Sequence, residues 1–153
     1  SSAASDVYKR QSAERIESLV DCNDARFLAP QSMIAEVKAY CSEHGQEVPE
    51  TPAQIAAVIY NSLAFCYGET VRELEEITGA SYRQIHIVGG GANADYLNRL
   101  TARYTGRTVY AGPTEATAIG NLSAQMLHAG CYADLQEARN GIFHSFEIKE
   151  YQP

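Results

Sequence analysis

Three consecutive glycines, Gly89, Gly90 and Gly91, are the residues of this sequence best suited to bind a ligand. They follow an apolar stretch at 84–88 and precede a helical pattern that begins near Asn93. Glycine permits positive φ and lets a backbone approach a ligand closely. The first turn of the following helix would present unpaired N–H groups to an anion such as phosphate, and Asn93 would cap that helix or bind the ligand. The run equally fits a turn that only packs a helix on a strand.

The spacing of Gly89, Gly91 and Ala94 also satisfies the dinucleotide fingerprint G-x-G-x-x-G/A. That fingerprint requires an acidic residue at the end of the next strand, to hold the ribose. Here the second strand ends near Ala111, and the nearest acid, Glu115, belongs to the helix that follows. A dinucleotide-binding domain would also open with this motif, whereas a long helical region precedes it. The sequence therefore disfavours an NAD-dependent oxidoreductase.

The other polar side chains indicate no catalytic arrangement. Glu115, in the first turn of its helix, is stabilised there by the helix dipole, and a role near a nucleotide or its metal is the less favoured alternative. His86 lies in a strand that we expect to be buried, so a core role is favoured over that of a base. The remaining histidines stand at helix ends or near the tail, where surface positions are typical (His44, His128, His144).

The cysteines and the apolar runs indicate which cellular compartment suits the chain and whether a zinc site is expected. None of the four cysteines has C-x-x-C spacing, which makes a zinc site improbable (Cys22, Cys41, Cys66, Cys131). Two disulfides are possible in principle, but Cys41 and Cys66 fall inside helical patterns, where free buried thiols are commoner. No secretory segment and no apolar run of ~18 residues is present. A reducing cytoplasm fits best.

Composition indicates a soluble globular protein: 45% of the 153 residues are hydrophobic and 20% are charged. The length suits one domain of ordinary size. The formal net charge is −7 and the few basic residues are scattered. Neither nucleic acid nor a membrane is therefore an expected partner.

The helical elements follow from apolar spacing and capping signals. We expect a short helix around 16–20, and a longer one from about 32 to Gly45. The segment 51–54 (Thr-Pro-Ala-Gln) has the sequence of a capping box, and it begins an amphipathic helix that continues to about Gly79.

The second half alternates strands and helices. It predicts strands at 84–88 and 108–110, separated by a helix at 93–104, and then helices at 115–128 and 134–141. The tail from 146 to 153 has no clear pattern. The fold class is therefore α/β with a βαβ unit.

Two strands alone cannot make a stable parallel sheet, because each needs partners. No third convincing strand is found, and the sequence does not begin with Met. We therefore expect the rest of the sheet, and an N-terminal domain, to lie upstream in a longer parent protein. Residues 1–11 read as a non-native or disordered leader, and residues 12–153 as part of one C-terminal nucleotide-binding domain.

Four segments together resemble one family: 39–41, 48–54, 85–93 and 111–121. They are similar to the rhamnulokinases, a group of the FGGY carbohydrate kinases, which have the actin-like (ribonuclease H-like) ATPase fold. The resemblance runs from about Ala13 to the end of the chain. One position departs from the family pattern, which has Asn where this chain has Ala94.

The resemblance implies a cytoplasmic kinase of rhamnose catabolism that transfers the γ-phosphate of ATP, with Mg²⁺, to the 1-hydroxyl of L-rhamnulose. It places adenosine and phosphate contacts on Gly89, Gly90 and Gly91, with Gly90 the best single candidate, and Asn93 is the candidate for a contact with adenine. The phosphate loop, the sugar site and the catalytic Asp of such kinases match no position here, so the isolated chain is expected to be inactive.

Two alternatives stay open beside the rhamnulokinase assignment. One is another FGGY kinase, acting on xylulose or fuculose, because sugar choice is set outside this chain. The other is a standalone nucleotide-binding protein without catalysis. An NAD-dependent oxidoreductase comes third.

Overall fold

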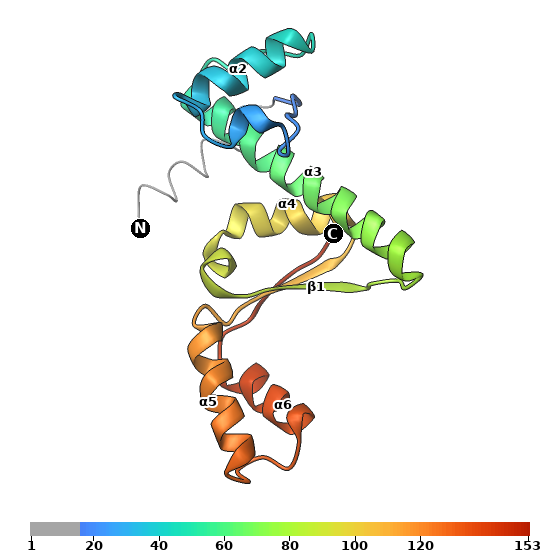
Figure 1. Ribbon diagram of the computed structural model, residues 1–153, viewed down its shortest axis with the longest axis vertical. Coiled ribbons are helices and arrows are strands. Elements are labelled where there is room, and N and C mark those ends of the chain that lie inside the picture. Colours follow the sequence, from blue (N-terminus) through green and yellow to red (C-terminus); the bar gives the residue numbers. More distant parts are fainter. Residues whose placement is uncertain (1–15) are drawn as a thin grey trace. The chain divides into compact units, whose positions relative to one another are not determined.

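The computed structural model describes residues 16–153, so the leader predicted at 1–11 lies outside the described residues. The chain divides into two compact units, Ser1–Gly79 and Ala80–Pro153. The described part of the first unit is helical, and the second contains the three strands together with its own helices (Figure 1). Whether 12–153 form one functional domain stays a prediction.

Two α-helices build the described part of the first unit, α2 (Met33–Glu43) and α3 (Pro52–Thr78). The predicted capping box is confirmed: the backbone N–H of Gln54 donates to the Thr51 hydroxyl oxygen at 3.2 Å, and the Gln54 side-chain oxygen accepts from the Thr51 N–H at 3.2 Å. At the other end Gly79 adopts φ 66°, which ends α3 where glycine makes left-handed backbone easy.

The core of the first unit lies between these helices. Val37 and Cys41 of α2 meet Ile55 and Val58 of α3, and all four are at most 6% exposed. Phe27, at the end of the short 3₁₀ helix η1 (Ala25–Phe27), packs against this cluster. Burial of these side chains is the main term that stabilises the unit.

The prediction of a helix at 16–20 was wrong, because the segment is extended. Ile16, Ser18 and Val20 are buried while the residues between them are more exposed, which is the period of two of an extended chain. The backbone N–H of Val20 donates to the buried Ser62 hydroxyl oxygen at 2.9 Å. In so short a stretch, apolar residues three and four apart fit either period, and the contacts with the helices decide.

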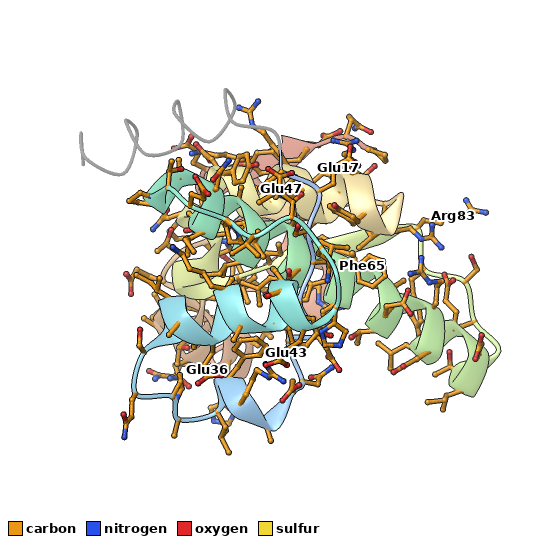
Figure 2. All side chains as sticks on the ribbon, turned by 90° about the horizontal axis from the view of Figure 1, so that it is seen from above. Glu17, Glu36, Glu43, Glu47, Phe65 and Arg83 are labelled. Carbon is orange, nitrogen blue, oxygen red and sulfur yellow. The ribbon has the colours of Figure 1, made fainter. Side chains whose placement is uncertain are left out.

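The extended segment is also held at the loop between the helices. The Gln46 amide accepts from the N–H of Leu19 and donates to its carbonyl, both at 2.8 Å. Next to it the Ser18 hydroxyl donates to the Glu47 carbonyl at 2.7 Å. Glu17 and Glu47, which neighbour this contact along the chain, are both exposed (Figure 2).

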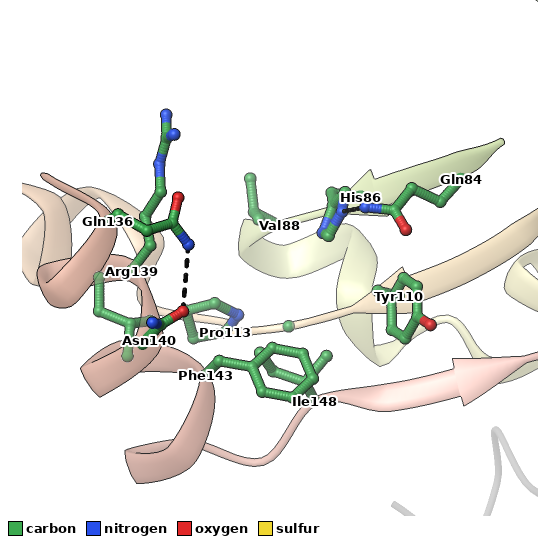
Figure 3. Close-up of a pocket in the computed structure, with 12 residues that line it drawn as sticks. Gln84, His86, Val88, Tyr110, Pro113, Gln136, Arg139, Asn140, Phe143 and Ile148 are labelled. Carbon is green, nitrogen blue, oxygen red and sulfur yellow. Dashed lines mark hydrogen bonds between the residues drawn. The ribbon is translucent and has the colours of Figure 1, made fainter. Parts of the chain in front are cut away.

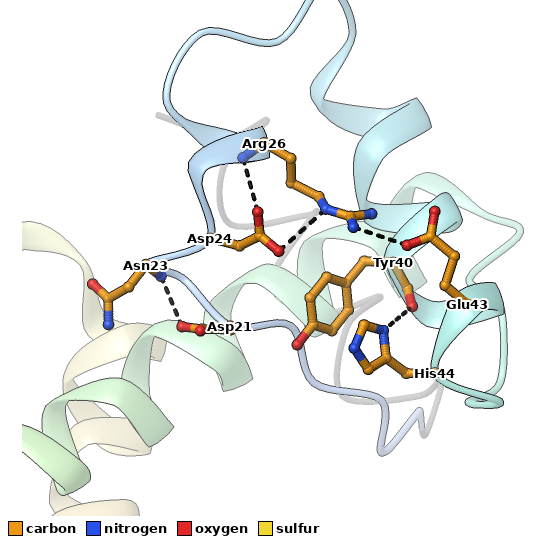
Figure 4. A network of polar contacts seen from close by, with 7 residues as sticks. All are labelled: Asp21, Asn23, Asp24, Arg26, Tyr40, Glu43 and His44. Carbon is orange, nitrogen blue, oxygen red and sulfur yellow. Dashed lines mark hydrogen bonds and ion pairs between the residues drawn. The ribbon is translucent and has the colours of Figure 1, made fainter.

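A polar network attaches η1 to the end of α2 (Figure 4). The Arg26 guanidinium pairs with Glu43 at 2.8 Å and Asp24 at 3.3 Å, and it lies 5.2 Å from the centre of the Tyr40 ring. His44 stacks on the same ring with centroids 4.0 Å apart. Arg26 and Asp24 are partly exposed and Glu43 is 55% exposed, so solvent screens the ion pairs and we assign them a modest contribution to stability.

All four cysteines are free, including Cys41 and Cys66, for which the helical patterns favoured free thiols. Cys41 is buried in the core, whereas Cys66 is half-buried. Among residues 16–153, no helix has the length and apolar character needed to cross a bilayer.

The second unit has a three-stranded sheet in the order β1-β2-β3. β1 (Gln84–Ile87) pairs in parallel with β2 (Thr108–Ala111), which confirms the βαβ unit. The prediction that the tail holds no strand was wrong, because β3 (Lys149–Tyr151) pairs antiparallel with β2. The second partner of β2 therefore comes from the tail rather than from a further parallel strand. The pairing with β2 stabilises β3, two of whose three residues, Lys149 and Glu150, have little strand propensity of their own.

Three helices complete this unit: α4 (Asp95–Thr105), α5 (Ala116–His128) and α6 (Leu135–Ser145). Gly106 ends α4 with φ 64°, as expected. Gly141 does not end α6, which continues to Ser145, because Gly141 does not adopt positive φ.

The two faces of the sheet differ. Val109 and Ala111 of the central strand are buried on the side of α4, at 0% and 3% exposure. On the other side lie His86 and Tyr110, whose rings stack with centroids 5.4 Å apart. β1 alternates exposed and half-buried residues, so the predictions of a buried strand and a core His86 were both wrong. An edge strand with one covered face leaves every second side chain open to solvent.

Candidate functional site

The glycine run forms a 3₁₀ turn, η2 (Gly89–Asn93), between the end of β1 and the start of α4. Gly89 has φ 73°, a conformation that side chains disfavour. Because this turn takes up the residues after the strand, α4 begins at Asp95 with Ala94 as its N-cap residue. The helix thus begins two residues after the predicted start near Asn93, and of the two roles expected for Asn93 the capping role is contradicted.

A second loop, at the end of β2, joins the glycine turn. The N–H of Gly89 donates to the Pro113 carbonyl at 3.0 Å, and the N–H of Gly112 donates to the Ile87 carbonyl at 2.8 Å. Both loops follow the carboxyl ends of adjacent parallel strands, which is where open α/β sheets bind their ligands. The structure therefore brings 89–93 and 112–115 together as one surface.

Asn93 contributes to this surface through its side chain. It is exposed, and its amide oxygen accepts a hydrogen bond from the Thr114 hydroxyl at 3.4 Å. The long distance indicates a weak bond. The amide of Asn93 therefore stays accessible to solvent or to a ligand at the junction of the two loops.

The three glycines differ in what the chain requires of them. Gly89 needs its positive φ, and a Cβ on Gly91 would lie 3.4 Å from the Ile87 side chain. Gly90 has neither constraint: its φ is not in the left-handed region and a Cβ would meet no atom within 4 Å. It is also exposed. The fold itself thus gives no reason for glycine at 90, whereas close approach of a ligand does.

Asn98, which sequence reasoning missed, anchors the turn from within α4. It is 1% exposed, and its side-chain NH₂ donates to the carbonyls of Ala92 at 3.1 Å and Gly91 at 3.5 Å. The buried amide thereby finds acceptors in the turn, and the Gly91 carbonyl also accepts from the Ala94 N–H at 3.1 Å. The signal in the sequence was a polar residue between the inward Leu97 and Leu100 of the same helix.

Asp95, the first residue of α4, is bound by the tail strand. Its Oδ1 accepts from the Tyr151 hydroxyl at 2.5 Å and from Lys149 Nζ at 3.1 Å. The hydrogen bond from Tyr151, followed by that from Lys149, lowers the pKa of the Asp95 carboxyl. Burial and then the bond to Asp95 raise the pKa of Tyr151, and a hydrogen bond with Asn98 opposes this rise.

Glu115 stands at the N-cap position of α5 rather than within its first turn. It is exposed, and its side chain makes no capping hydrogen bond. The structure therefore shows no capping hydrogen bond that would account for a carboxylate at this position. His44, His128 and His144 are exposed, as predicted.

A cavity of about 690 Å³ opens on the other face of the sheet, against α6 (Figure 3). Its wall includes the stacked rings of His86 and Tyr110 and the Phe143 ring, which meets Tyr110 edge-on at 6.4 Å. Gln136 and Asn140 of α6 hydrogen-bond each other at 3.1 Å at its rim. Val88, Gly112 and Pro113 line it as well, so the cavity reaches the back of the two loops.

Within residues 16–153, no group of three or more His, Cys, Asp or Glu side chains is arranged to hold a metal ion. The exposed loop surface presents backbone groups and the Asn93 amide instead. Such a surface suits the phosphates and sugar of a nucleotide better than a metal bound only by protein.

Comparison with known proteins shows the family to which the chain belongs. Residues 2–129 match the C-terminal domain of the FGGY family of carbohydrate kinases. A rhamnulokinase of Bacillus subtilis (strain 168) is 46% identical over 140 residues, covering 92% of this chain and 29% of the relative. A rhamnulokinase of Oceanobacillus iheyensis is 45% identical over 138 residues, covering 90% and 29%.

A more distant rhamnulokinase, of Pectobacterium carotovorum, is 43% identical over 136 residues, covering 89% of this chain and 27% of the relative. The chain thus spans less than a third of the length of these relatives. The chain belongs to the FGGY family of carbohydrate kinases and has the ribonuclease H-like α/β fold of its C-terminal domain.

Proposed function

We propose that this chain is the ATP-binding portion of a rhamnulokinase, which transfers the γ-phosphate of ATP to the 1-hydroxyl of L-rhamnulose. The family match and the names of the relatives support the kinase class and the sugar. The single observation that supports the site is Gly90, an exposed glycine for which the fold has no steric or conformational need.

The loop surface fits a nucleotide. In this proposal the backbone of Gly89, Gly90 and Gly91 lies against the adenosine and the neighbouring phosphates, and the accessible amide of Asn93 supplies a polar contact. ATP, when bound, supplies the phosphoryl group. Mg²⁺ would be held chiefly by the phosphates, since this ion usually keeps few protein ligands in kinases.

Phosphoryl transfer also needs an acceptor hydroxyl placed in line and a carboxylate that takes its proton. We infer that the phosphate loop, the sugar site and the catalytic Asp belong to an N-terminal domain in the part of the relatives that this chain does not cover. The 153-residue chain would then bind nucleotide without phosphorylating sugar. The cytoplasm, where ATP is present, is the proposed compartment.

Binding of MgADP to the chain, measured by isothermal titration calorimetry, tests the site. Wild type should bind MgADP in preference to NAD, and Gly90→Asp should abolish binding, because a carboxylate would meet phosphate. Gly90→Ala is the matched comparison: the fold accepts its methyl group, and because that group is small and uncharged it should weaken binding less than Gly90→Asp. Undiminished binding by Gly90→Asp would move the site elsewhere, and preference for NAD would favour an oxidoreductase.

The activity is tested in the protein encoded by the whole gene. We expect the reading frame upstream of Ser12 to encode a phosphate loop and a catalytic Asp, and its product to phosphorylate L-rhamnulose faster than xylulose or fuculose. Preference for one of the other sugars would assign a different FGGY kinase. A start codon close to Ser12 would favour the standalone nucleotide-binding protein, and sugar phosphate made by the 153-residue chain would contradict the proposal.

A further inference from the structure

The tail strand β3 directs two side chains at the start of α4. Lys149 and Tyr151 are alternate residues of a strand and so share a face. Both donate to the same oxygen of Asp95, at 3.1 Å and 2.5 Å. Glu150, between them, lies on the opposite face. The tail is therefore connected to the helix that follows the glycine turn, as well as to the neighbouring strand.

Helix α4 connects Asp95 to the turn through Asn98, which lies one helical turn further along. The buried Asn98 amide donates to the carbonyls of Ala92 and Gly91. The Tyr151 hydroxyl therefore binds the first residue of the helix that holds the turn. A shift of α4 at Asp95 would move Asn98 with it, and with Asn98 the backbone of Gly91 and Ala92.

The tail also touches the second loop of the site. A Cβ on Gly112 would lie 2.6 Å from the Glu147 carbonyl oxygen, so the backbone just before β3 packs tightly on the loop that accepts the Gly89 hydrogen bond. One short segment, 147–151, therefore contacts the second loop at Gly112 and helix α4 at Asp95, two residues beyond the glycine turn. The backbone pairing of β3 with β2 would hold the strand without Lys149 and Tyr151 pointing at Asp95.

We propose that Tyr151, assisted by Lys149, is a positioning residue for the nucleotide-binding turn, and that it acts through Asp95 and Asn98. This inference rests on the proposed nucleotide site at 89–93. It predicts that nucleotide affinity depends on the order of the C-terminal tail, although the tail itself contributes no group to the ligand. Displacing the tail would weaken nucleotide binding without altering a contact residue.

The test compares three single variants of the whole chain. Tyr151→Phe removes only the hydroxyl, and Asp95→Asn removes the charge that both tail residues bind. Glu150→Gln is the control, since it changes a charge on the opposite face of the same strand. Two quantities are measured in each: amide hydrogen exchange of Gly89 and Ala94, whose N–H groups hold the turn, and the Kd for MgADP.

Tyr151→Phe and Asp95→Asn should each speed exchange at Gly89 and Ala94, and raise the Kd for MgADP, by roughly two- to tenfold, the range expected for one hydrogen bond. Glu150→Gln should change neither by as much as twofold. The double variant Tyr151→Phe/Asp95→Asn should show less than the product of the two single effects, because both remove the same bond.

The exchange data separate this inference from the proposed function. Unchanged exchange at the turn in Tyr151→Phe would overturn the inference whether or not MgADP binds. An equal effect of Glu150→Gln would show that only general tail stability matters, and would overturn it as well. Absence of MgADP binding by wild type would contradict the proposed nucleotide site. The exchange rates would still decide whether Tyr151 positions the turn.

Discussion

The backbone N–H of Gly89 donates a hydrogen bond to the carbonyl oxygen of Pro113, at 3.0 Å. Together with the bond from the Gly112 N–H to the Ile87 carbonyl, it joins the loop after β1 to the loop after β2, and Gly89 makes it with φ 73°. The candidate nucleotide surface is thus a property of two loops together. Substitutions that strain either loop should affect the other.

Gly89→Ala should destabilise the chain by about 1–2 kcal/mol, because an L-residue is forced into left-handed backbone. Gly90→Ala, one position along, should change stability by less than about 0.5 kcal/mol, since neither φ nor space opposes the methyl group. Thermal unfolding followed by circular dichroism compares the two. Equal melting temperatures would mean that the backbone at position 89 of the Gly89→Ala variant leaves positive φ at little cost in free energy.

A second pair of glycine variants tests the packing of the tail on the second loop. Gly112→Ala should cost about 2–3 kcal/mol, because its φ is 134° and the new Cβ would clash with the Glu147 carbonyl. Gly120→Ala, inside α5 and with open space around it, should instead stabilise by about 0.5–1 kcal/mol. Chemical denaturation measures both. A harmless Gly112→Ala would show that segment 147–148 can move away freely.

Ser62→Ala should destabilise the first unit by about 1–3 kcal/mol, because it leaves the buried N–H of Val20 without an acceptor. The exposed Ser42→Ala in α2 is the control and should change stability by less than about 0.5 kcal/mol. The same denaturation experiment applies. If the two serines behave alike, the extended segment at 16–20 is held by its apolar side chains alone.

The bonds to Asp95 should make stability depend on pH in the acid range. The pKa of this carboxyl is lowered in the folded chain from its ordinary value of 3.8, so the unfolded chain takes up the proton first. The stabilisation is therefore complete at pH values above about 4 and is lost as pH falls through the folded pKa.

Wild type should exceed Asp95→Asn in unfolding free energy by up to about 1 kcal/mol at pH 7, because the half-exposed partners are screened by solvent. The difference should shrink in denaturation curves taken at successively lower pH below 4. A difference that stayed constant down to pH 2 would show that the charge of Asp95 does not provide the stabilisation.

Local sequence signals predicted the elements whose cause is local. Thr51, Pro52 and Gln54 carry the whole capping box within four residues, so the start of α3 was found correctly. The change from helical spacing to β-branched residues, followed by Gly89, likewise located β1 and the turn. Most helix ends were predicted to within a residue or two, because glycines such as Gly79 and Gly106 end them locally. Gly141 was the exception.

The features that the sequence did not reveal depend on partners distant along the chain. β3 is a strand because β2 offers it an edge, about 40 residues away, and no pattern in Lys149, Glu150 and Tyr151 indicates this. The extended 16–20 segment depends in the same way on Ser62 and Gln46. His86 is exposed because of which side of β1 the helix α4 covers, and one isolated strand cannot show that.

The sequence by itself thus determined the α/β class, the glycine turn and the family, since these reside in contiguous residues and their spacing. Only the tertiary structure decided that Gly89 joins Pro113, that Asn98 holds the turn, and that Tyr151 reaches Asp95. The physical reason is that hydrogen bonds and burial between segments far apart are set by the packed chain, where each group needs a partner that its own neighbours in sequence do not provide.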